Sequence, residues 1–420
     1  MEIREYIESL GHRAKQAAAA LSVTTPAQRI AALREIAAMI RAHKDEIMSE
    51  NDADLRDAAE KDLSDAMQDR LRLNDKRIEL MASSIEQIAA QDEIVGRIED
   101  ERTRPNGLKV ARMRIPLGVI AIIYEARPNV TSDAAALCLK TANAVILKGG
   151  KEAFHTNIVI AHIIQDALEH AGLPRDAVIL VETTEREAVS ILIRQNQTID
   201  LLIPRGGENL IRFVTDNATI PVIQHYKGVC HIFVEKTADI DKALPILLNA
   251  KCQRPGVCNA METLLLDAEL PQAAKRRILE TLIQNKVTLH ADETLCKDFA
   301  DLPLVPATEE DWPREYLSLD LAVREVAGLD GAIAHIRKYT SLHTESILTQ
   351  DDALAERFLR EVNSSTVLVN ASTRFADGGE LGLGAEIGIS TSKLHAFGPM
   401  GCEDLTTRKF IVRGSGQIRG

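Results

Sequence analysis

Between residues 117 and 230, short apolar runs alternate with stretches of helical periodicity, and this alternation leaves few folds open to the chain. Five runs read as strands: LGVIAIIY, NAVILKG, AVILVE, IDLLIP and IPVIQ. The intervening stretches predict helices near 132–142, 156–171, 185–195 and 208–216. Strands and helices in this order predict an α/β fold with a mostly parallel, doubly wound sheet. Such sheets bind nucleotides at the carboxyl ends of their strands.

The flanking regions extend this pattern. The first 95 or so residues read as helices, and TTPAQRIAALREIAAMI carries a clear start, with Thr25 as N-cap, Pro26 at the first helical position and Gln28 completing a capping box. The charged run SENDADLRDAAEKDLSD predicts a solvated helix surface. A second α/β block spans about 231–365, with strands at VCHIFVE, METLLLD and STVLVN and helices near 239–252 and 271–285.

A ribbon near 102–116 lies between the N-terminal helices and the first α/β block. Asn106-Gly107 is a strong hairpin signal, and the strand residues around it mix polar and apolar side chains on both faces. This mixture predicts an exposed arm with little core of its own. The stretch LTTRKFIVRG near the C-terminus predicts a further strand.

Composition excludes several classes of protein. A chain of 420 residues predicts two or three lobes. A net charge of −12 and 3% aromatic residues argue against a nucleic-acid-binding platform. No run approaches the roughly 20 apolar residues of a membrane span, and neither end resembles a targeting signal. We therefore expect a soluble, cytoplasmic protein that acts on a small molecule and has no nucleic-acid or membrane partner.

The six cysteines predict neither a disulfide nor a metal site, because their spacings match no zinc module. Cys230 and His231 are adjacent in a predicted strand and point to opposite faces, so they cannot share one ion. Cys252 ends an apolar helix and is expected to be packed. Cys258 follows a helix break on a turn with Arg254 nearby, a setting that can favour an exposed thiolate nucleophile.

Two double-glycine turns are candidate cofactor contacts. In ILKGGKE the predicted strand ends at Lys148, followed by Gly149, and in IPRGGENL a strand leads through Gly206 and Gly207 into a helix. A helix N-terminus at such a turn can face a pyrophosphate. The chain lacks a G-x-G-x-x-G fingerprint after the first strand, and GELGLG at 379–384 reads as a loop.

Longer motifs carry a family resemblance. The stretches PLGVIAIIYEARPNV, HYKGVCHIFV, CQRPGVCNAMETLL, ASTRFADGGELGLGAEIGISTSKLHA and GPMG occur in order over nearly the whole length. Together they resemble the aldehyde dehydrogenase superfamily. The resemblance implies a Rossmann-like cofactor domain (1–101 and 117–228), a catalytic domain (229–365), an oligomerisation arm (102–116 and 403–420) and a glycine-rich segment on the substrate and cofactor side (366–402). A homo-oligomer, dimer or higher, is expected.

The resemblance also implies roles for single residues. Cys258 matches the family's nucleophile, Lys148 the lysine that contacts the adenosine ribose, and Glu315 the glutamate that holds the nicotinamide-side ribose. Asn129 is the candidate oxyanion donor. Arg127 and Arg374 are candidate substrate contacts by position alone.

Two departures from the family pattern refine this reading. His225 stands where hydrolytic relatives carry a water-activating glutamate, which favours an enzyme that exchanges its acyl group with phosphate. Phe397 stands where an arginine is expected, so another group must supply that cation if it binds substrate.

The implied activity is NADPH-dependent reduction of L-glutamyl 5-phosphate to L-glutamate 5-semialdehyde through a cysteine thioacyl intermediate, a step of proline biosynthesis; the product then cyclises spontaneously to 1-pyrroline-5-carboxylate. The alternative is another acylating enzyme of this fold that uses phosphate or coenzyme A. Two other classes stay open, a non-catalytic nucleotide-binding protein and a thiol redox sensor that uses Cys252 and Cys258.

Overall fold

The computed structural model describes residues 2–61, 63 and 65–419, which form two compact units. Unit 1 holds the chain through Gln224, together with Gly382–Gly388 and the stretch from Met400 onward. Unit 2 holds His225–Leu381 and Ile389–Pro399. The chain therefore passes repeatedly between the units, and the glycine-rich segment is divided between them. None of the helices in the described part of the chain is long and apolar enough to span a bilayer.

Unit 1 begins with helices, as the sequence predicts. Thr25 accepts the backbone N–H of Gln28, whose side chain accepts the N–H of Thr25, so the predicted capping box is confirmed. Apolar residues on the inward face of the second helix are buried, among them Leu33, Ile36 and Ile40. The helices are α1 (Ile3–Leu21), α2 (Pro26–Ala42), α3 (Lys44–Glu60), α4 (Asp65–Leu71) and α5 (Asp75–Ala90).

The charged run in α3 was expected to be solvated, and this prediction is wrong at two positions. Asp54 is buried and accepts hydrogen bonds from the backbone N–H groups of His155 and Thr156. It thereby caps the first turn of α7. The side chain of Asn51 is also buried and contacts Thr156 and the backbone of Leu71.

The sheet of unit 1 is parallel and has the order β5-β4-β3-β6. The order reverses direction between β3 and β6, which is the switch point where α/β sheets bind ligands. The predicted strand IPVIQ is wrong, because this segment forms only an isolated bridge between Val222 and Leu202. The elements are β3 (Val119–Tyr124), α6 (Asn129–Lys140), β4 (Ala144–Lys148), η1 (Lys151–Ala153), α7 (Phe154–His170), η2 (Arg175–Ala177), β5 (Val178–Leu180), α8 (Arg186–Leu192), β6 (Leu201–Arg205) and α9 (Glu208–Asn217).

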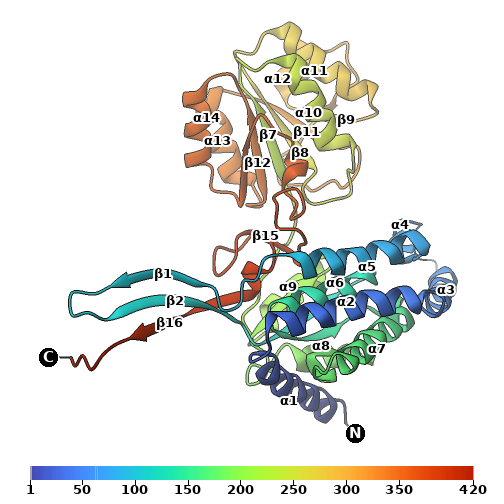
Figure 1. Ribbon diagram of the computed structural model, residues 1–420. Helices are drawn as coiled ribbons and strands as arrows, with labels where there is room; N and C mark the ends of the chain where they lie inside the picture. Colours follow the sequence, from blue (N-terminus) through green and yellow to red (C-terminus); the bar gives the residue numbers. More distant parts are fainter. Residues whose placement is uncertain (1, 62, 64, 420) are drawn as a thin grey trace. The chain divides into compact units, whose positions relative to one another are not determined.

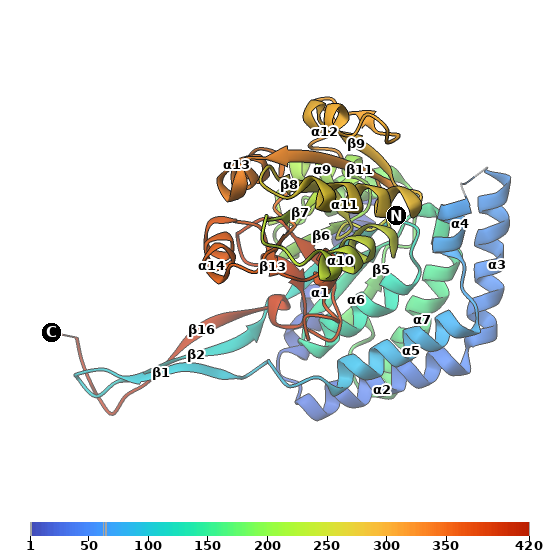
Figure 2. The same cartoon turned by 90° about the horizontal axis from the view of Figure 1, so that it is seen from above.

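An arm of three antiparallel strands extends from the helices of unit 1, as Figures 1 and 2 both show. It consists of β1 (Ile98–Thr103), β2 (Lys109–Pro116) and β16 (Thr406–Arg413), with β2 in the middle. The predicted hairpin turn is confirmed, since Gly107 has φ +84° and donates to the carbonyl of Arg104. The arm's first strand starts at Ile98, before the predicted boundary.

Unit 2 contains a seven-stranded sheet with the order β10-β9-β11-β8-β7-β12-β13, in which all pairs are parallel. Its strands are β7 (Cys230–Val234), β8 (Met261–Asp267), β9 (Thr288–Ala291), β10 (Val305–Pro306), β11 (Asp320–Val326), β12 (Thr344–Leu348) and β13 (Thr366–Val369). Separate hydrophobic clusters cover its two faces. One cluster includes side chains of α10 (Ile240–Cys252), α11 (Gln272–Gln284) and α12 (Glu293–Asp298), and the other includes side chains of α13 (Gly328–Tyr339) and α14 (Asp352–Glu361). Figure 1 shows these two groups of helices on opposite faces of the sheet.

Short elements complete the chain. The strands β14 (Gly388–Ser390) and β15 (Gly398–Met400) pair with each other, and η3 (Thr373–Phe375) and η4 (Glu403–Leu405) are single 3₁₀ turns.

Candidate functional site

The segments that carry the reactive side chains of unit 2 meet at the amino ends of neighbouring strands. The turn with Cys258 leads into β8, Gly228 precedes β7, and His343 precedes β12. Because β8, β7 and β12 are parallel neighbours, their amino ends lie at one edge of the sheet. In α/β sheets, nucleotides usually bind at the carboxyl ends of the strands. The strand pattern therefore indicated the opposite edge of the sheet.

Gly228 lies directly against the backbone of Cys258. A Cβ atom at Gly228 would overlap the carbonyl group of Cys258, so only glycine permits this approach. Cys230 Sγ donates to the same carbonyl oxygen at 3.2 Å, and Ala260 N–H donates to the carbonyl of Val257 at 3.0 Å. Cys258 therefore sits on a stiff, partly exposed turn, as the sequence predicts for a nucleophile.

A buried ion pair joins the segments before and after this turn. Lys251, at the end of α10, and Glu262, at the start of β8, are both fully buried and bond at 2.7 Å. Burial raises the pKa of Glu262 to about 7, although Lys251 opposes that shift. Glu262 occupies an irregularity in the β7–β8 register, a feature that often re-aims a side chain beside active sites.

Glu315 joins the same site. Its Oε1 accepts the backbone N–H of Gly228 at 2.8 Å, so the residue expected to hold a ribose lies one glycine away from the predicted nucleophile. The following loop is held by Glu262, which accepts the N–H of Leu317 at 3.2 Å.

Two histidines adjoin the thiol. One ligand atom from each of His225, Cys258 and His343, here called the Cys258 cluster, lies within 4.8 Å of the others. The two imidazole rings are 5.1 Å apart between centroids. His343 is fully buried, and burial lowers its pKa to about 3, so it is neutral at physiological pH.

The other thiols are poor nucleophiles. Burial raises the pKa of Cys230 well above its ordinary value and also raises the pKa of Cys252, which packs against the core of unit 2. Cys230 contacts His343 Nδ1 at 3.7 Å, whereas His231 bonds Glu345 at 2.9 Å. The adjacent side chains thus meet different partners, as alternation along a strand requires.

Arg374 is bonded to Asn259, the residue that follows Cys258 in the chain. Its guanidinium donates to the Asn259 side-chain oxygen and, at 3.0 Å, to Gln253 Oε1. The Asn259 amide in turn donates to the carbonyl of Ala376 at 3.0 Å. This network fastens η3 to the Cys258 turn and leaves Arg374 partly exposed.

Phe397, where an arginine was expected, has a cation above it. Lys393 Nζ lies 5.6 Å from the ring centroid, within the range of a cation–π interaction. The lysine is exposed, so its charge is accessible on unit 2.

In unit 1 the predicted cofactor contacts lie at the carboxyl ends of β4 and β6. Lys148 ends β4 with its side chain largely buried and its Nζ donating to the carbonyl of Gly149 at 2.8 Å. Burial lowers the pKa of Lys148, while nearby Glu152 acts in the opposite direction. A side chain at Gly149 would collide with Asn157, so the turn needs glycine.

The second glycine turn already holds an acidic group. Glu125 Oε2 accepts the N–H of Gly207 at the start of α9 at 2.9 Å, and a Cβ at Gly206 would lie 2.6 Å from the same oxygen. A phosphate at this helix N-terminus must therefore displace or share the donor that Glu125 uses.

Asn129 and Arg127 are both exposed near the start of α6. The Asn129 amide donates to Asp133 Oδ2 at 2.9 Å, one helical turn later. Burial raises the pKa of Asp133 to about 6. These residues belong to unit 1, whereas Cys258, Glu315 and Arg374 belong to unit 2.

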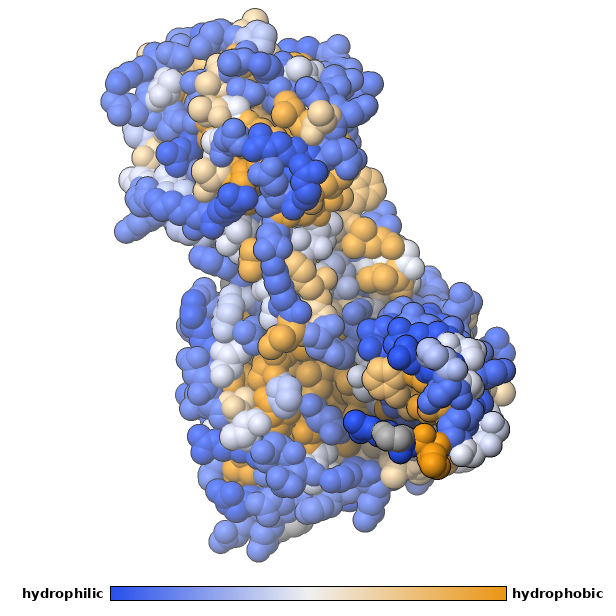
Figure 3. Space-filling model, turned by 90° about the vertical axis from the view of Figure 1, so that its left-hand side faces the viewer, coloured by the Kyte–Doolittle hydropathy of each residue, from blue (hydrophilic) through white to orange (hydrophobic). Residues whose placement is uncertain are grey.

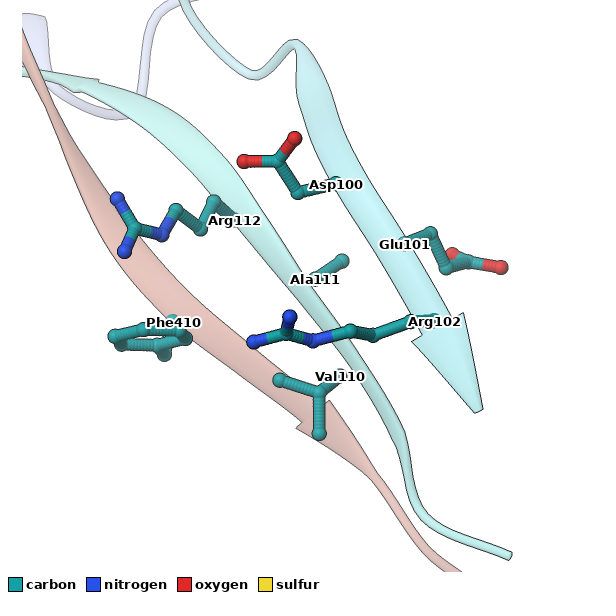
Figure 4. A pocket seen from close by; sticks show the side chains of 7 residues that line it. All are labelled: Asp100, Glu101, Arg102, Val110, Ala111, Arg112 and Phe410. Carbon is teal, nitrogen blue, oxygen red and sulfur yellow. The ribbon is translucent and has the colours of Figure 1, made fainter. Parts of the chain in front are cut away.

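The arm itself carries a pocket, lined by residues of β1, β2 and β16. Figure 4 shows Arg102 of β1 and Arg112 of β2 with their guanidinium groups directed toward β16, the strand that carries Phe410. Arg112 lies 4.8 Å from the Phe410 ring centroid. Phe410 and Val412 are 61% and 57% exposed, and Figure 3, which faces the arm, shows hydrophobic surface on it.

Four residues of this site were not found from the sequence. Gly228 gave no signal beyond its place in a family motif, and His343 lies far along the chain from Cys258. Lys251 and Glu262 could have been noticed as charges inside apolar elements, because buried charges are normally paired.

The chain is similar to known proteins over its whole length. The family model described as "Aldehyde dehydrogenase family" matches residues 3–297. A γ-glutamyl phosphate reductase of Geobacter metallireducens is 54% identical over all of both chains, and one of Idiomarina loihiensis is 51% identical over 99% of both. The crystal structure of γ-glutamyl phosphate reductase from Thermotoga maritima is 42% identical over 99% of this chain and 100% of that one, with a TM-score of 0.96.

Proposed function

This chain belongs to the aldehyde dehydrogenase family, and on that premise we propose that it reduces L-glutamyl 5-phosphate to L-glutamate 5-semialdehyde and phosphate. The activity is a step of proline biosynthesis from glutamate. Full-length identity of 51–54% to relatives named for this reaction carries the proposal. The partly exposed Cys258 on its glycine-supported turn supplies the matching chemistry.

The reaction proceeds through the thiolate of Cys258. Its sulfur attacks the acyl carbon, the bond from that carbon to the phosphate oxygen breaks, and phosphate leaves with the electron pair and takes a proton from solvent. After reduction, the tetrahedral oxyanion collapses and expels the thiolate, which releases the aldehyde. Two easier steps replace one difficult step, which is the advantage of covalent catalysis.

The residues at the carboxyl edge of the unit 1 sheet fit a nicotinamide cofactor. When bound, the cofactor supplies the hydride that reduces the thioester carbonyl carbon. Lys148 can bind hydroxyl oxygens of a ribose, and the side-chain-free turns at Gly149 and Gly206–Gly207 leave room for backbone approach. Glu315 is the corresponding candidate in unit 2. We assign NADPH as the reductant, with Lys148 or Lys151 at its 2′-phosphate.

Substrate recognition needs cations and an oxyanion donor. We assign the oxyanion to Asn129 together with backbone N–H groups; loss of one such donor typically costs about 10²–10³-fold in kcat. Arg374, tied to Asn259 beside the nucleophile, and the exposed Arg127 are candidates for the substrate carboxylate. Lys393, above Phe397, is our candidate for the cation that this chain lacks at position 397.

We also propose that the arm joins copies of the chain. Strand β16 is an outer strand with exposed Phe410 and Val412, and exposed strand edges with apolar residues favour pairing with another chain.

The reverse reaction tests the function. Purified protein is mixed with L-glutamate 5-semialdehyde and NADP⁺, and NADPH absorbance is followed with phosphate, with coenzyme A or with neither. The proposal predicts reduction that requires phosphate. Cys258→Ala should abolish it, while Cys252→Ala, at a packed thiol nearby, should retain it. Activity with coenzyme A alone would identify the alternative acylating enzyme, and phosphate-independent activity would identify a hydrolytic one.

A further inference from the structure

We propose that the Cys258 cluster is a binding site for a zinc-like divalent cation, with Cys258 Sγ and one imidazole nitrogen each from His225 and His343 as ligands. The expectation of no metal site rested on cysteine spacing along the chain. The fold instead brings together three ligands from segments that precede β7, β8 and β12. All three belong to unit 2.

The donor set fits borderline-soft cations. Zinc is bound in proteins by thiolate and imidazole, and three protein ligands with an open fourth position are a recurrent arrangement. One thiolate and two neutral imidazoles leave a bound Zn²⁺ with a net charge of +1. The open position can then accept water or an anion.

The imidazole of His343 is held in place and has one nitrogen available to bind a metal ion. Its Nδ1 contacts Thr344 Oγ1 at 2.7 Å, and its backbone carbonyl accepts Ser365 Oγ at 2.6 Å, so the ring is fixed. Among the residues that the structure describes, none bonds to the buried Nε2. Metal-bound histidines commonly have the second nitrogen held by such an outer partner, which fixes the tautomer.

The three ligand atoms need to move only a short distance to form a tetrahedral metal site. With zinc–sulfur and zinc–nitrogen distances of about 2.3 and 2.0–2.1 Å, a tetrahedral site places its ligand atoms about 3.3–3.6 Å apart. The ligand atoms here lie within 4.8 Å of one another. Cys258 and His225 are both partly exposed, so their side chains can rotate toward the fixed His343.

Metal binding has a consequence that rests on the proposed function. A thiolate that coordinates zinc is not available to attack the acyl phosphate. Zinc at this site should therefore inhibit reversibly and compete with acylation.

Cobalt titration tests the site without any turnover. Co²⁺ is added anaerobically to the full-length protein in a thiol-free reductant, and absorption is recorded. The proposal predicts a thiolate-to-cobalt charge-transfer band in the near ultraviolet, saturating at one Co²⁺ per chain and removed by Zn²⁺. Cys258→Ser should lose the band, and His343→Asn should weaken binding by about 10-fold or more.

Controls separate this inference from the proposed function. Cys252→Ser changes a thiol outside the cluster and should keep the band, and Zn²⁺ should protect Cys258, but not Cys252, from alkylation. A missing band, or one that persists in Cys258→Ser, overturns the metal site. If the band appears in a protein with no phosphate-dependent activity, the metal site stands and the proposed function falls.

Discussion

At the scale of single residues, the position of Cys258 depends on what its neighbours lack. Gly228 has no side chain, and this absence lets the backbone before β7 lie against the Cys258 carbonyl while Glu315 accepts the Gly228 N–H. The sequence predicted a turn at Cys258, which the structure contains, and favoured this residue as a candidate nucleophile. It could not predict this support, because a close backbone approach between distant segments leaves no periodic signal.

Gly228→Ala should reduce kcat by about 10²-fold, because the added methyl group overlaps the Cys258 carbonyl and shifts the proposed nucleophile by a fraction of an ångström or more. Steady-state kinetics with saturating cofactor would measure this loss. Gly256→Ala is the matched control, since the nearest atom to its Cβ is 3.8 Å away. Equal rates for both variants would contradict the packing argument.

Lys148→Ala should raise the KM for NADPH more than that for NADH, because the lysine ends β4 at the cofactor edge and supplies a positive charge for the 2′-phosphate. The ratio of kcat/KM values for the two cofactors measures the effect. An unchanged ratio would remove Lys148 from this role and leave Lys151 as the matched alternative.

At the scale of elements, the predictions that succeeded were those with a local cause. The capping box at Thr25 and the strands of the first sheet follow from residues a few positions apart. The failures had causes elsewhere in the chain. Asp54 reads as a solvated helix residue until α7 places two N–H groups against it, and IPVIQ has the composition of a strand but only one bridge to β6.

In α13, His335 is buried against Trp312. Its pKa is lowered to about 2, chiefly by burial and then by the charges of His231, Arg324 and Lys338. An unfolded histidine has a pKa near 6.5, so below that pH the unfolded chain binds a proton that the folded chain does not. Unit 2 should therefore lose stability as the pH falls below about 6.5.

Between pH 7.5 and 5.5, the free energy of unfolding of the natural chain should fall by about 1.4 kcal/mol more than that of the His335→Gln variant. Urea unfolding followed by fluorescence of Trp312, the single tryptophan, reports on this unit. The same pH dependence in both proteins would show that His335 is not the titrating group.

At the scale of the whole molecule, the chain combines two α/β units with an arm whose outer strand exposes Phe410 and Val412. The α/β class was predictable because strand–helix alternation repeats along the sequence. The edge of the sheet that carries Cys258 was not predictable, because it assembles the amino ends of strands that are neighbours only in the sheet.

Phe410→Asp should yield a smaller particle by light scattering after size exclusion, because a charge replaces the exposed ring on the arm. The circular dichroism spectrum of the variant should match that of the natural chain, because Arg112 lies close enough to pair with the new carboxylate. A natural chain that is monomeric, or a variant of unchanged mass, would contradict an oligomerisation role for the arm.

The central claim is that Cys258 carries the acyl group between phosphate release and reduction. The most direct measurement is mass spectrometry of the protein after brief exposure to freshly generated L-glutamyl 5-phosphate without cofactor. The account predicts one glutamyl adduct on the peptide containing Cys258, which disappears when NADPH is added. An adduct on a different residue, or active protein that never carries one, would contradict it.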